Sequence, residues 1–214
     1  LGIMGSSGAG KSTLLNCIST IDSVSAGKII LDGKEVNLLK DKMLARFRRE
    51  NLGFIFQDFS LLDNLTIYDN IALALTINNV PTDVIKKKVE HVAKQLGIYE
   101  ILQHYPYETS GGQKQRCACA RAIINEPKLV LADEPTAALD SKNSDGLLEL
   151  FEQINNEGQT ILMVTHSSLA ASHASRVLFI KDGQIFHQLY RAGKSNNEFN
   201  RDITTAITSL LGGE

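Results

Sequence analysis

The feature that most constrains the fold is a glycine-rich segment close to the start of the chain. Residues Gly5-Ser6-Ser7-Gly8-Ala9-Gly10-Lys11-Ser12 fit the pattern G-x-x-x-x-G-K-[ST]. In this pattern the glycines let backbone N–H groups converge on phosphate oxygens, Lys11 adds a positive charge, and Ser12 offers a hydroxyl to Mg²⁺. The apolar run Leu1–Met4 precedes the segment, and a helical pattern over Lys11–Thr20 follows it. The sequence therefore predicts a strand, a phosphate-binding loop and a helix, in this order.

The rest of the chain alternates short apolar runs with helical patterns. The apolar runs predict strands at Leu1–Met4, Gly53–Phe56, Lys128–Ala132, Thr160–Thr165 and Val177–Lys181, and a β-hairpin over Lys28–Val36. Helical periodicity appears at Lys11–Thr20, Thr82–Leu96, Gly112–Asn125, Ser141–Asn156 and Glu198–Leu211. We therefore expect an α/β fold with a mainly parallel sheet and a small antiparallel part.

The stretch from about residue 58 to about residue 125 contains helical patterns and no convincing strand. We interpret it as a helical subdomain inserted between two strands of the sheet. We thus expect residues 1–214 to be one domain, with a core formed by about 1–57 and 126–214. Because Leu1 is not Met and already lies in an apolar run, we expect the chain to be truncated at its N-terminus, within a buried strand.

Charge and hydropathy argue against two classes of protein. The 214 residues include 22 Lys and Arg against 24 Asp and Glu, and the formal charge of −2 gives no basic footprint for nucleic acid. The most apolar stretch, Ile71–Ile77, is far shorter than the roughly 20 residues that span a bilayer. The cysteines Cys17, Cys117 and Cys119 form no C-x-x-C pair, and Cys117 and Cys119 point in different directions on a helix. We interpret all three as small buried packing residues in a reducing compartment.

A later apolar run ends in two adjacent carboxylates, in Leu129-Val130-Leu131-Ala132-Asp133-Glu134. At the end of a strand Asp133 can reach Mg²⁺, directly or through water. Glu134 is then placed to polarise an attacking water, as general base or as a group that positions the water. Many strands end in acidic turns, so the pair is a weak signal by itself. Together with the phosphate-binding loop it indicates phosphoryl-transfer chemistry.

Four further short motifs carry a family resemblance. Thr109-Ser110-Gly111-Gly112-Gln113 resembles the LSGGQ signature of ABC ATPases. Gln57, after the strand at Gly53–Phe56, resembles their Q-loop, Ala138-Leu139-Asp140 their D-loop, and Thr165-His166 their switch histidine. The resemblance covers nearly the whole chain, which is identified on these motifs as a member of that family.

The resemblance implies ATP and Mg²⁺ as cofactors, bound at two composite sites of a symmetric dimer. Ser110 and its glycines precede a helix whose unpaired N-terminal amides make a second anion site. Two copies arranged head-to-tail place each signature over the ATP of the other copy. Nucleotide contacts are implied for Gly5, Ser6, Gly8, Ala9, Gly10, Lys11, Ser12, Thr13, Ser110, Gly111, Gly112, Gln113 and Asp140. Catalytic roles are implied for Glu134, His166, Gln57 and Lys11, and contacts to Mg²⁺ for Ser12, Gln57 and Asp133.

The whole set of motifs looks closest to bacitracin-export-type ATP-binding subunits, which serve resistance to antimicrobial peptides. The matching stretches are Leu15–Asp22, Gly53–Asp63, Tyr105–Arg116 and Val177–Phe186. This implies a separate membrane permease, a peripheral place on the cytoplasmic side of the membrane and, through the permease, a two-component sensor system. The permease would bind the chain near the Q-loop, where Phe59, Leu61 and Leu62 either line a groove or pack in the core.

Several alternatives share part of this pattern. Lipoprotein-release, macrolide-export and cell-division-type cassettes, the last driving a mechanotransmission permease, carry the same catalytic motifs and stay open. DNA-repair and chromosome-structure ATPases need a long coiled coil between the loop and the signature, for which this chain has no room. Translation-factor types carry two cassettes in one chain, whereas this sequence contains the motifs of one cassette. A degenerate regulatory nucleotide binder is disfavoured by the intact residues Lys11, Gln57, Asp133, Glu134 and His166.

The chain departs from the family pattern in three places. Thr109 replaces the usual aliphatic residue of the signature, and Ser167 follows His166 where relatives often carry an acid. The aromatic residue that stacks on adenine in the family lies before the phosphate-binding loop, outside this chain. Neither the transported substrate nor the direction of transport is encoded in these motifs, because the permease determines both.

Overall fold

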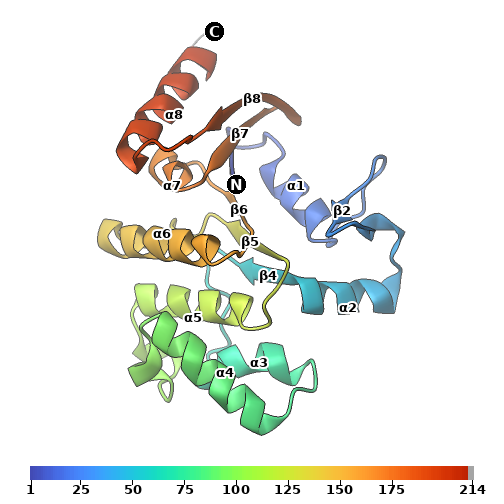
Figure 1. The fold of residues 1–214 in the computed structure, drawn as a ribbon, viewed down its shortest axis with the longest axis vertical. Coiled ribbons are helices and arrows are strands. Elements are labelled where there is room, and N and C mark those ends of the chain that lie inside the picture. Colours follow the sequence, from blue (N-terminus) through green and yellow to red (C-terminus); the bar gives the residue numbers. More distant parts are fainter. Residues whose placement is uncertain (212–214) are drawn as a thin grey trace.

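A computed structural model describes residues 1–211 of the chain (Figure 1). Its centre is a six-stranded sheet with the order β4-β5-β6-β1-β7-β8. Five strands are parallel, and β8 runs antiparallel to β7 at one edge. The strands are β1 Gly2–Met4, β4 Leu52–Ile55, β5 Leu129–Asp133, β6 Ile161–Val164, β7 Arg176–Lys181 and β8 Gln184–Tyr190. A separate antiparallel hairpin pairs β2 Ile30–Leu31 with β3 Lys34–Glu35. The predicted α/β fold with a mainly parallel sheet and a small antiparallel part is confirmed.

The helices cover both faces of this sheet. They are α1 Lys11–Ile18, α2 Asp41–Asn51, α3 Ile67–Thr76, α4 Thr82–Gln95, α5 Gly111–Ile123, α6 Ser141–Asn156, α7 Ser168–Ser172 and α8 Asn196–Leu211, with short 3₁₀ turns at Val36–Leu38, Tyr99–Ile101 and Pro106–Glu108. In Figure 1 the helices α3, α4 and α5 form one end of the molecule and α8 the other. The division into a core and a helical subdomain remains a prediction.

The two faces of the sheet follow from the alternation of side chains along its central strands. Val130 and Ala132 of β5 belong to the same hydrophobic cluster as α5 and α6. Leu129 and Leu131 of the same strand pack instead in a cluster with Leu15 of α1. The first turn of α1 and the first turn of α5 therefore belong to helices on opposite faces of the sheet.

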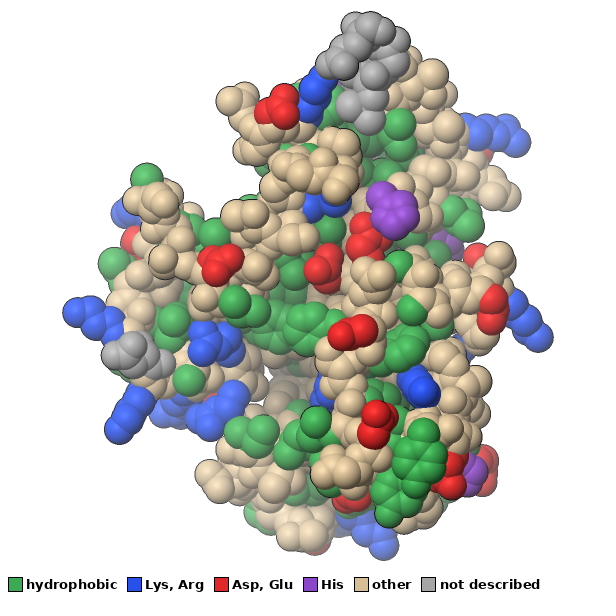
Figure 2. Space-filling model, turned by 180° about the vertical axis from the view of Figure 1, so that it is seen from behind, with side chains coloured by type: hydrophobic (Ala, Val, Ile, Leu, Met, Phe, Trp, Pro, Cys, Tyr) green, Lys and Arg blue, Asp and Glu red, His purple; other side chains and the backbone are tan. Residues whose placement is uncertain are grey.

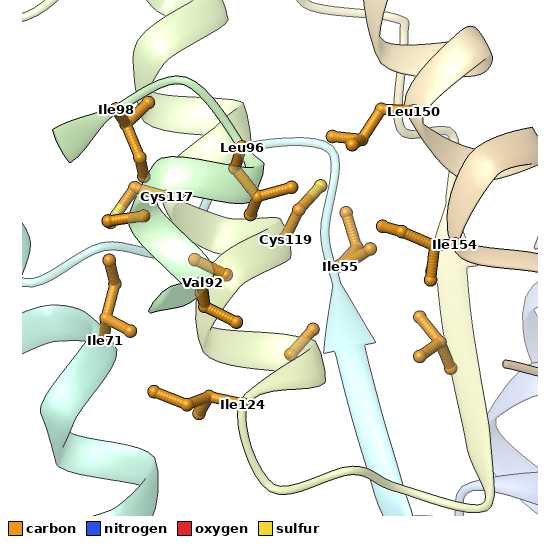
Figure 3. Close-up of a cluster of buried hydrophobic side chains, with 14 of the residues drawn as sticks. Ile55, Ile71, Val92, Leu96, Ile98, Cys117, Cys119, Ile124, Leu150 and Ile154 are labelled. Atoms are coloured by element: carbon orange, nitrogen blue, oxygen red, sulfur yellow. The ribbon is translucent and has the colours of Figure 1, made fainter. Parts of the chain in front are cut away.

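The larger cluster joins α3, α4 and α5 to the sheet without a break (Figure 3). A reciprocal capping box between Thr66 and Asp69 starts α3, and its Ile67, Ile71 and Leu75 then recur at the spacing of one helix face and are all buried. Each such side chain contributes about 1.5–3 kcal/mol through burial. The elements that carry the Q-loop and the signature therefore pack in one hydrophobic core.

Two of the three cysteines are packing residues, as predicted. Cys117 and Cys119 are fully buried, and Figure 3 shows their sulfurs pointing to different parts of the core. Burial raises the pKa of Cys117 to about 12 and also raises the pKa of Cys119, so both stay neutral thiols. Cys17 differs from the prediction, because it is only half-buried. It lies in the short helix α1, which has a single fully buried residue, Leu15.

The sequence interpretation missed α2, the short helix α7 and the edge strand β8, and it gave no range for α3 within the stretch that it expected to be helical. Most residues of β8 are exposed, so no apolar alternation marks the strand. The turn before it carried a usable signal: Lys181 pairs with Gln184 across Asp182-Gly183, and both turn residues have positive φ (50° and 74°). Asp-Gly between two apolar runs is a strong hairpin signal. The helix α2 was hidden by its polar composition, since among its described side chains only Phe47 is buried.

Charges of both signs share the molecular surface. On the face shown in Figure 2, Asp and Glu side chains run down the middle, and Lys and Arg side chains lie mainly toward the margins. Within residues 1–211, none of the helices has the length and apolar character needed to cross a bilayer.

Candidate phosphate-binding and catalytic site

The strand register brings the phosphate-binding loop, the two carboxylates and the histidine to one edge of the sheet. Ile3 of β1 lies opposite Val164 of β6, and Val164 lies opposite Asp133 of β5. The three strands are parallel, so the segments that follow them leave at the same edge. On the next strand, Ile55 of β4 lies opposite Ala132, and Gln57 follows two residues later. Gln57 is exposed at this edge.

Close contacts in the phosphate-binding loop require glycine. A Cβ at Gly5 would lie 2.3 Å from the carbonyl oxygen of Ile180 in β7. Gly8 and Gly10 have φ values of 80° and 97°, in the left-handed region that favours glycine. The N–H of Gly183, in the β7–β8 turn, donates to the carbonyl of Ala9 at 3.1 Å. The loop is therefore held against β7 and its turn, with its free side facing solvent at Ser6 and Gly8.

The start of α1 offers positive charge and carries no acidic residue of its own. The Lys11 ammonium donates to the carbonyl oxygens of Gly5 and Ser6, each at 2.8 Å, so it lies over the loop. The helix has no acidic residue in its first turn, and Gly10 has no side chain to cap it. Ser12 and Thr13 are exposed. The first-turn N–H groups and Lys11 together suit a phosphate group.

Asp133 is partly buried beside this loop. Burial, and then the neighbouring Glu134 carboxylate, raise the pKa of Asp133, and the Lys11 ammonium opposes that shift. In the described part of the chain no three His, Cys, Asp or Glu side chains form a metal cluster. A magnesium ion held by Ser12 and Asp133 would therefore complete its coordination with phosphate oxygens and water, which is how Mg²⁺ is usually bound. The donor set fits Mg²⁺ in the presence of a nucleotide.

Glu134 and His166 form a direct pair. Glu134 Oε1 lies 2.9 Å from His166 Nδ1, and its Oε2 accepts the His166 backbone N–H at 3.3 Å. The Glu134 N–H donates to Val164 O at 2.9 Å, and Glu134 has a φ of 46°, which is rare for a residue other than glycine. The Glu134 side chain is 16% exposed and that of His166 is 72% exposed. This contact between the two side chains was not predicted from the sequence.

The signature lies elsewhere, at the start of α5. Ser110 and Gln113 form a reciprocal capping box: Gln113 N–H donates to Ser110 Oγ at 3.3 Å, and Ser110 N–H donates to Gln113 Oε1 at 2.9 Å. Ser110 is exposed, and Gly111 is half-buried. The departure at Thr109 is accommodated locally, because its hydroxyl donates to the carbonyl of Pro106 at 2.8 Å. The structure thus separates the signature from the phosphate-binding loop of the same chain.

The D-loop packs against this signature. A Cβ at Gly112 would lie 2.3 Å from Asn143 Oδ1, so the two residues are in close contact. Asn143 in turn donates to the Asp140 carboxylate through its backbone N–H (2.9 Å) and its Nδ2 (2.7 Å). These bonds lower the pKa of Asp140, which caps α6. Asn143 was missed by the sequence reasoning, because no motif marks it.

Gln115 is a second residue that no motif revealed. It is fully buried on α5, and its Nε2 donates to the carbonyl of Pro135 at 2.7 Å. Pro135 directly follows Glu134, so this bond ties α5 to the segment that carries the carboxylates. The other departure, Ser167, caps α7 through a bond from the Ala170 N–H to its Oγ at 3.2 Å.

Comparison with known proteins shows the family of the chain. The family profile described as "ABC transporter" matches residues 1–137, more than half of the chain. The chain belongs to the ABC transporter family. A bacitracin export ATP-binding protein of Halalkalibacterium halodurans is 52% identical over 99% of this ABC chain and 83% of the relative. A macrolide export ATP-binding/permease protein of Wolinella succinogenes is 39% identical over 98% of the chain but only 32% of the relative.

A solved structure extends the likeness to most of the chain. The dimeric post-hydrolysis state of an ATP-binding cassette bound to ADP and phosphate has a TM-score of 0.79 and 36% identity, and it covers 88% of this chain and 84% of the other. Within the ABC family this chain is an ATP-binding, ATP-hydrolysing subunit.

Proposed function

We propose that this chain hydrolyses Mg-ATP in a head-to-tail dimer with a second copy, and that it drives a separate permease that protects the cell against bacitracin-like peptides. The observation that carries the catalytic part is the Glu134–His166 pair beside the phosphate-binding loop. The subunit would lie on the cytoplasmic side of the membrane, bound to the permease. Through the permease it would act with a two-component sensor system.

The phosphate-binding loop would hold the nucleotide through its N–H groups and Lys11. Lys11 would exchange its bonds to the Gly5 and Ser6 carbonyls for bonds to phosphate oxygens. Ser12, Asp133 and Gln57 would hold Mg²⁺. When bound, the ion neutralises negative charge on the phosphates.

Glu134 would orient the attacking water and accept its proton. The water oxygen bonds to the terminal phosphorus as the bond from this phosphorus to the ADP oxygen breaks. The His166 N–H and ring fix the direction of the Glu134 carboxylate. With Nδ1 turned to Glu134, the other ring nitrogen, Nε2, is left for the terminal phosphate. The proposed roles of Glu134 and His166 thus depend on one another.

The position of α5 supports the dimer. The α1 and α5 helices pack on opposite faces of the sheet, so the signature at Ser110–Gln113 needs another copy to meet a nucleotide. The structural neighbour bound to ADP and phosphate is dimeric. A symmetric pair would use each signature on the nucleotide of the partner. Asp140, in contact with Asn143 beside Gly112, would lie at the junction of the two sites.

A groove beside the edge strand β4 suits the permease. It has a volume of about 460 Å³, and its lining includes the apolar side chains of Phe54, Phe56 and Ile77 and the basic side chains of Arg48 and Arg49. This combination fits the end of an amphipathic helix that carries an acidic residue. Phe59, Leu61 and Leu62 do not line this groove, and their contact with the permease stays a separate prediction. Leu61 packs against the core instead.

Co-purification tests the proposal. The full-length subunit with Glu134→Gln, tagged and held in Mg-ATP in its native membranes, should retain a permease with a large extracellular domain. The ATPase of the wild-type complex should then respond to bacitracin. A division-type or lipoprotein-type permease would move the function to those cassettes, and the absence of any membrane partner would contradict the transport assignment.

Two exposed side chains make a matched test of the groove. Ile77 lies in the groove and Leu62 outside it, and they are 47% and 45% exposed. Ile77→Asp should release the permease, whereas Leu62→Asp should retain it. The reverse result would place the permease on the segment after Gln57.

A further inference from the structure

Arg121 of α5 holds the turn that follows Gln57. Its guanidinium donates to the carbonyl oxygens of Ser60 (2.6 Å, from Nη1) and Phe59 (3.1 Å, from Nη2). Arg121 is half-buried, and burial lowers its pKa, although the guanidinium stays charged. A planar fork that donates to two consecutive carbonyls fixes their direction as well as their position.

The turn itself has an unusual backbone. Phe59 and Ser60 have φ values of 64° and 47°, so two consecutive residues with a Cβ occupy the left-handed region. Such a conformation persists where the surroundings determine it. Ser60 closes the turn on Asp58 through its N–H (2.8 Å to Asp58 O) and its hydroxyl (2.7 Å to Asp58 Oδ1).

The same turn also touches the signature. A Cβ at Gly111 would lie 3.9 Å from Phe59 Cζ, so the ring lies against the first residue of α5. Arg121 stands roughly three helical turns further along α5. The turn thus contacts α5 near the start of the helix and again near its end. Gln57 lies only two residues before Phe59.

We propose that Arg121 is a positioning residue that fixes Gln57 relative to the signature, so that both move as one unit with α5. This inference rests on the proposed dimer, in which the signature serves the ATP of the partner and Gln57 serves the ATP of its own chain. Arg121 thereby links the two nucleotide sites of the dimer. It acts through the turn and does not touch the nucleotide.

The test compares two arginines of α5. Lysine at position 121 keeps the charge but cannot make the planar fork. In the full-length subunit with its permease, Arg121→Lys should lower kcat about tenfold and leave the KM for ATP within about twofold. Arg116→Lys is the matched control, because Arg116 donates to the Leu96 carbonyl at 3.0 Å, away from the Q-loop. It should leave both constants within about twofold.

Hydrogen exchange gives a second readout that does not depend on ATP hydrolysis. In Arg121→Lys the amides of Phe59 and Ser60 should exchange about tenfold faster, while amides of the α5 interior keep their protection. In Arg116→Lys the exchange at Phe59 and Ser60 should be unchanged.

Two results would overturn the proposal: unchanged exchange at Phe59 and Ser60 in Arg121→Lys, or an equal loss of kcat in both variants. An equal loss would show that the arginines only pack the helix. A wild-type protein without ATPase activity would refute the proposed function instead, and the exchange measurement would still decide on the turn.

Discussion

The N-termini of α1 and α5, the two candidate anion sites, are built in different ways. At α1 the cap is Gly10, the preceding loop is made of glycine and small residues, and the Lys11 side chain donates to two loop carbonyls. At α5 the cap is Ser110, which exchanges two hydrogen bonds with Gln113. The N-terminus of α1 leaves its N–H groups free for a ligand, whereas at the N-terminus of α5 side chains already bond some of the N–H groups.

This difference fits a division of labour between the two ends. The phosphate-binding loop is suited to hold phosphate in the single chain, because its cap, Gly10, has no side chain to occupy the helix terminus. The signature is folded and capped without a nucleotide, so it is preformed for the ATP that a second copy brings. The comparison therefore predicts that variants at the two ends have different effects on the isolated chain and on the dimer.

Removal of the loop lysine should have the largest effect. Lys11→Ala should weaken the binding of ATP to the isolated chain by about 100-fold or more, because the phosphates lose their charged partner. Ser110→Ala should leave this affinity within about twofold, and should cost only about 0.5–2 kcal/mol of stability through the lost cap. Titration calorimetry measures the affinity and urea denaturation the stability. An equal loss of affinity in both variants would show that the signature acts on the ATP of its own chain.

Two glycine substitutions compare the rigidity of the two ends. A Cβ at Gly5 would lie 2.3 Å from a backbone oxygen, and a Cβ at Gly112 would lie 2.3 Å from the end of the Asn143 side chain. Backbone of the central sheet cannot move aside, so Gly5→Ala should cost about 2–3 kcal/mol. At Gly112 the Asn143 side chain can shift, and alanine favours the helix by about 1 kcal/mol, so the net cost should be about 1 kcal/mol or less. Urea denaturation measures the loss in free energy of unfolding for both variants. Equal losses would mean that the Asn143 side chain is as rigid as the sheet.

The carboxylates Asp133 and Asp140 should respond with opposite signs to the same substitution. The folded-state pKa of Asp133 is raised, so its carboxylate weakens the fold above that pKa, and the effect disappears as the pH falls toward about 4. Asp133→Asn should therefore raise the melting temperature of the nucleotide-free chain at pH 7, by roughly 1–3 °C.

The pKa of Asp140 is lowered, so its carboxylate stabilises the fold above about pH 4, and this contribution is lost as the pH falls through the folded-state pKa. Asp140→Asn should slightly lower the melting temperature at pH 7 and have no effect in strong acid. Shifts of the same sign for the two variants at pH 7 would contradict the assigned environments.

The sequence predicted those elements whose residue pattern follows directly from burial or from a required backbone conformation. The apolar runs of β1, β4, β5, β6 and β7 are buried, so their pattern predicted them. Strand β8 is mostly exposed and α2 buries little, so neither carries an apolar pattern. For β8, the Asp182-Gly183 turn was the signal that could have found it.

The sequence did not predict the contacts that join distant parts of the chain within the site. The Glu134–His166 pair, the bond from Gln115 to Pro135 and the bonds from Arg121 to the Phe59–Ser60 turn each depend on how strands and helices pack. The groove beside β4 shows the same limit, because its lining comes from residues that are spread between positions 48 and 125. Local motifs name the chemical groups, and the packing decides which of them touch.

The association state of the Glu134→Gln subunit tests the central claim most directly. This variant should bind ATP without hydrolysing it, so sedimentation in Mg-ATP should show a dimer and sedimentation without nucleotide a monomer. Adding Ser110→Arg to the same chain should keep ATP binding and abolish the dimer, because the signature can no longer meet the ATP of the partner. A Glu134→Gln protein that stays monomeric at saturating Mg-ATP, or a dimer that ignores the Ser110→Arg change, would contradict the account.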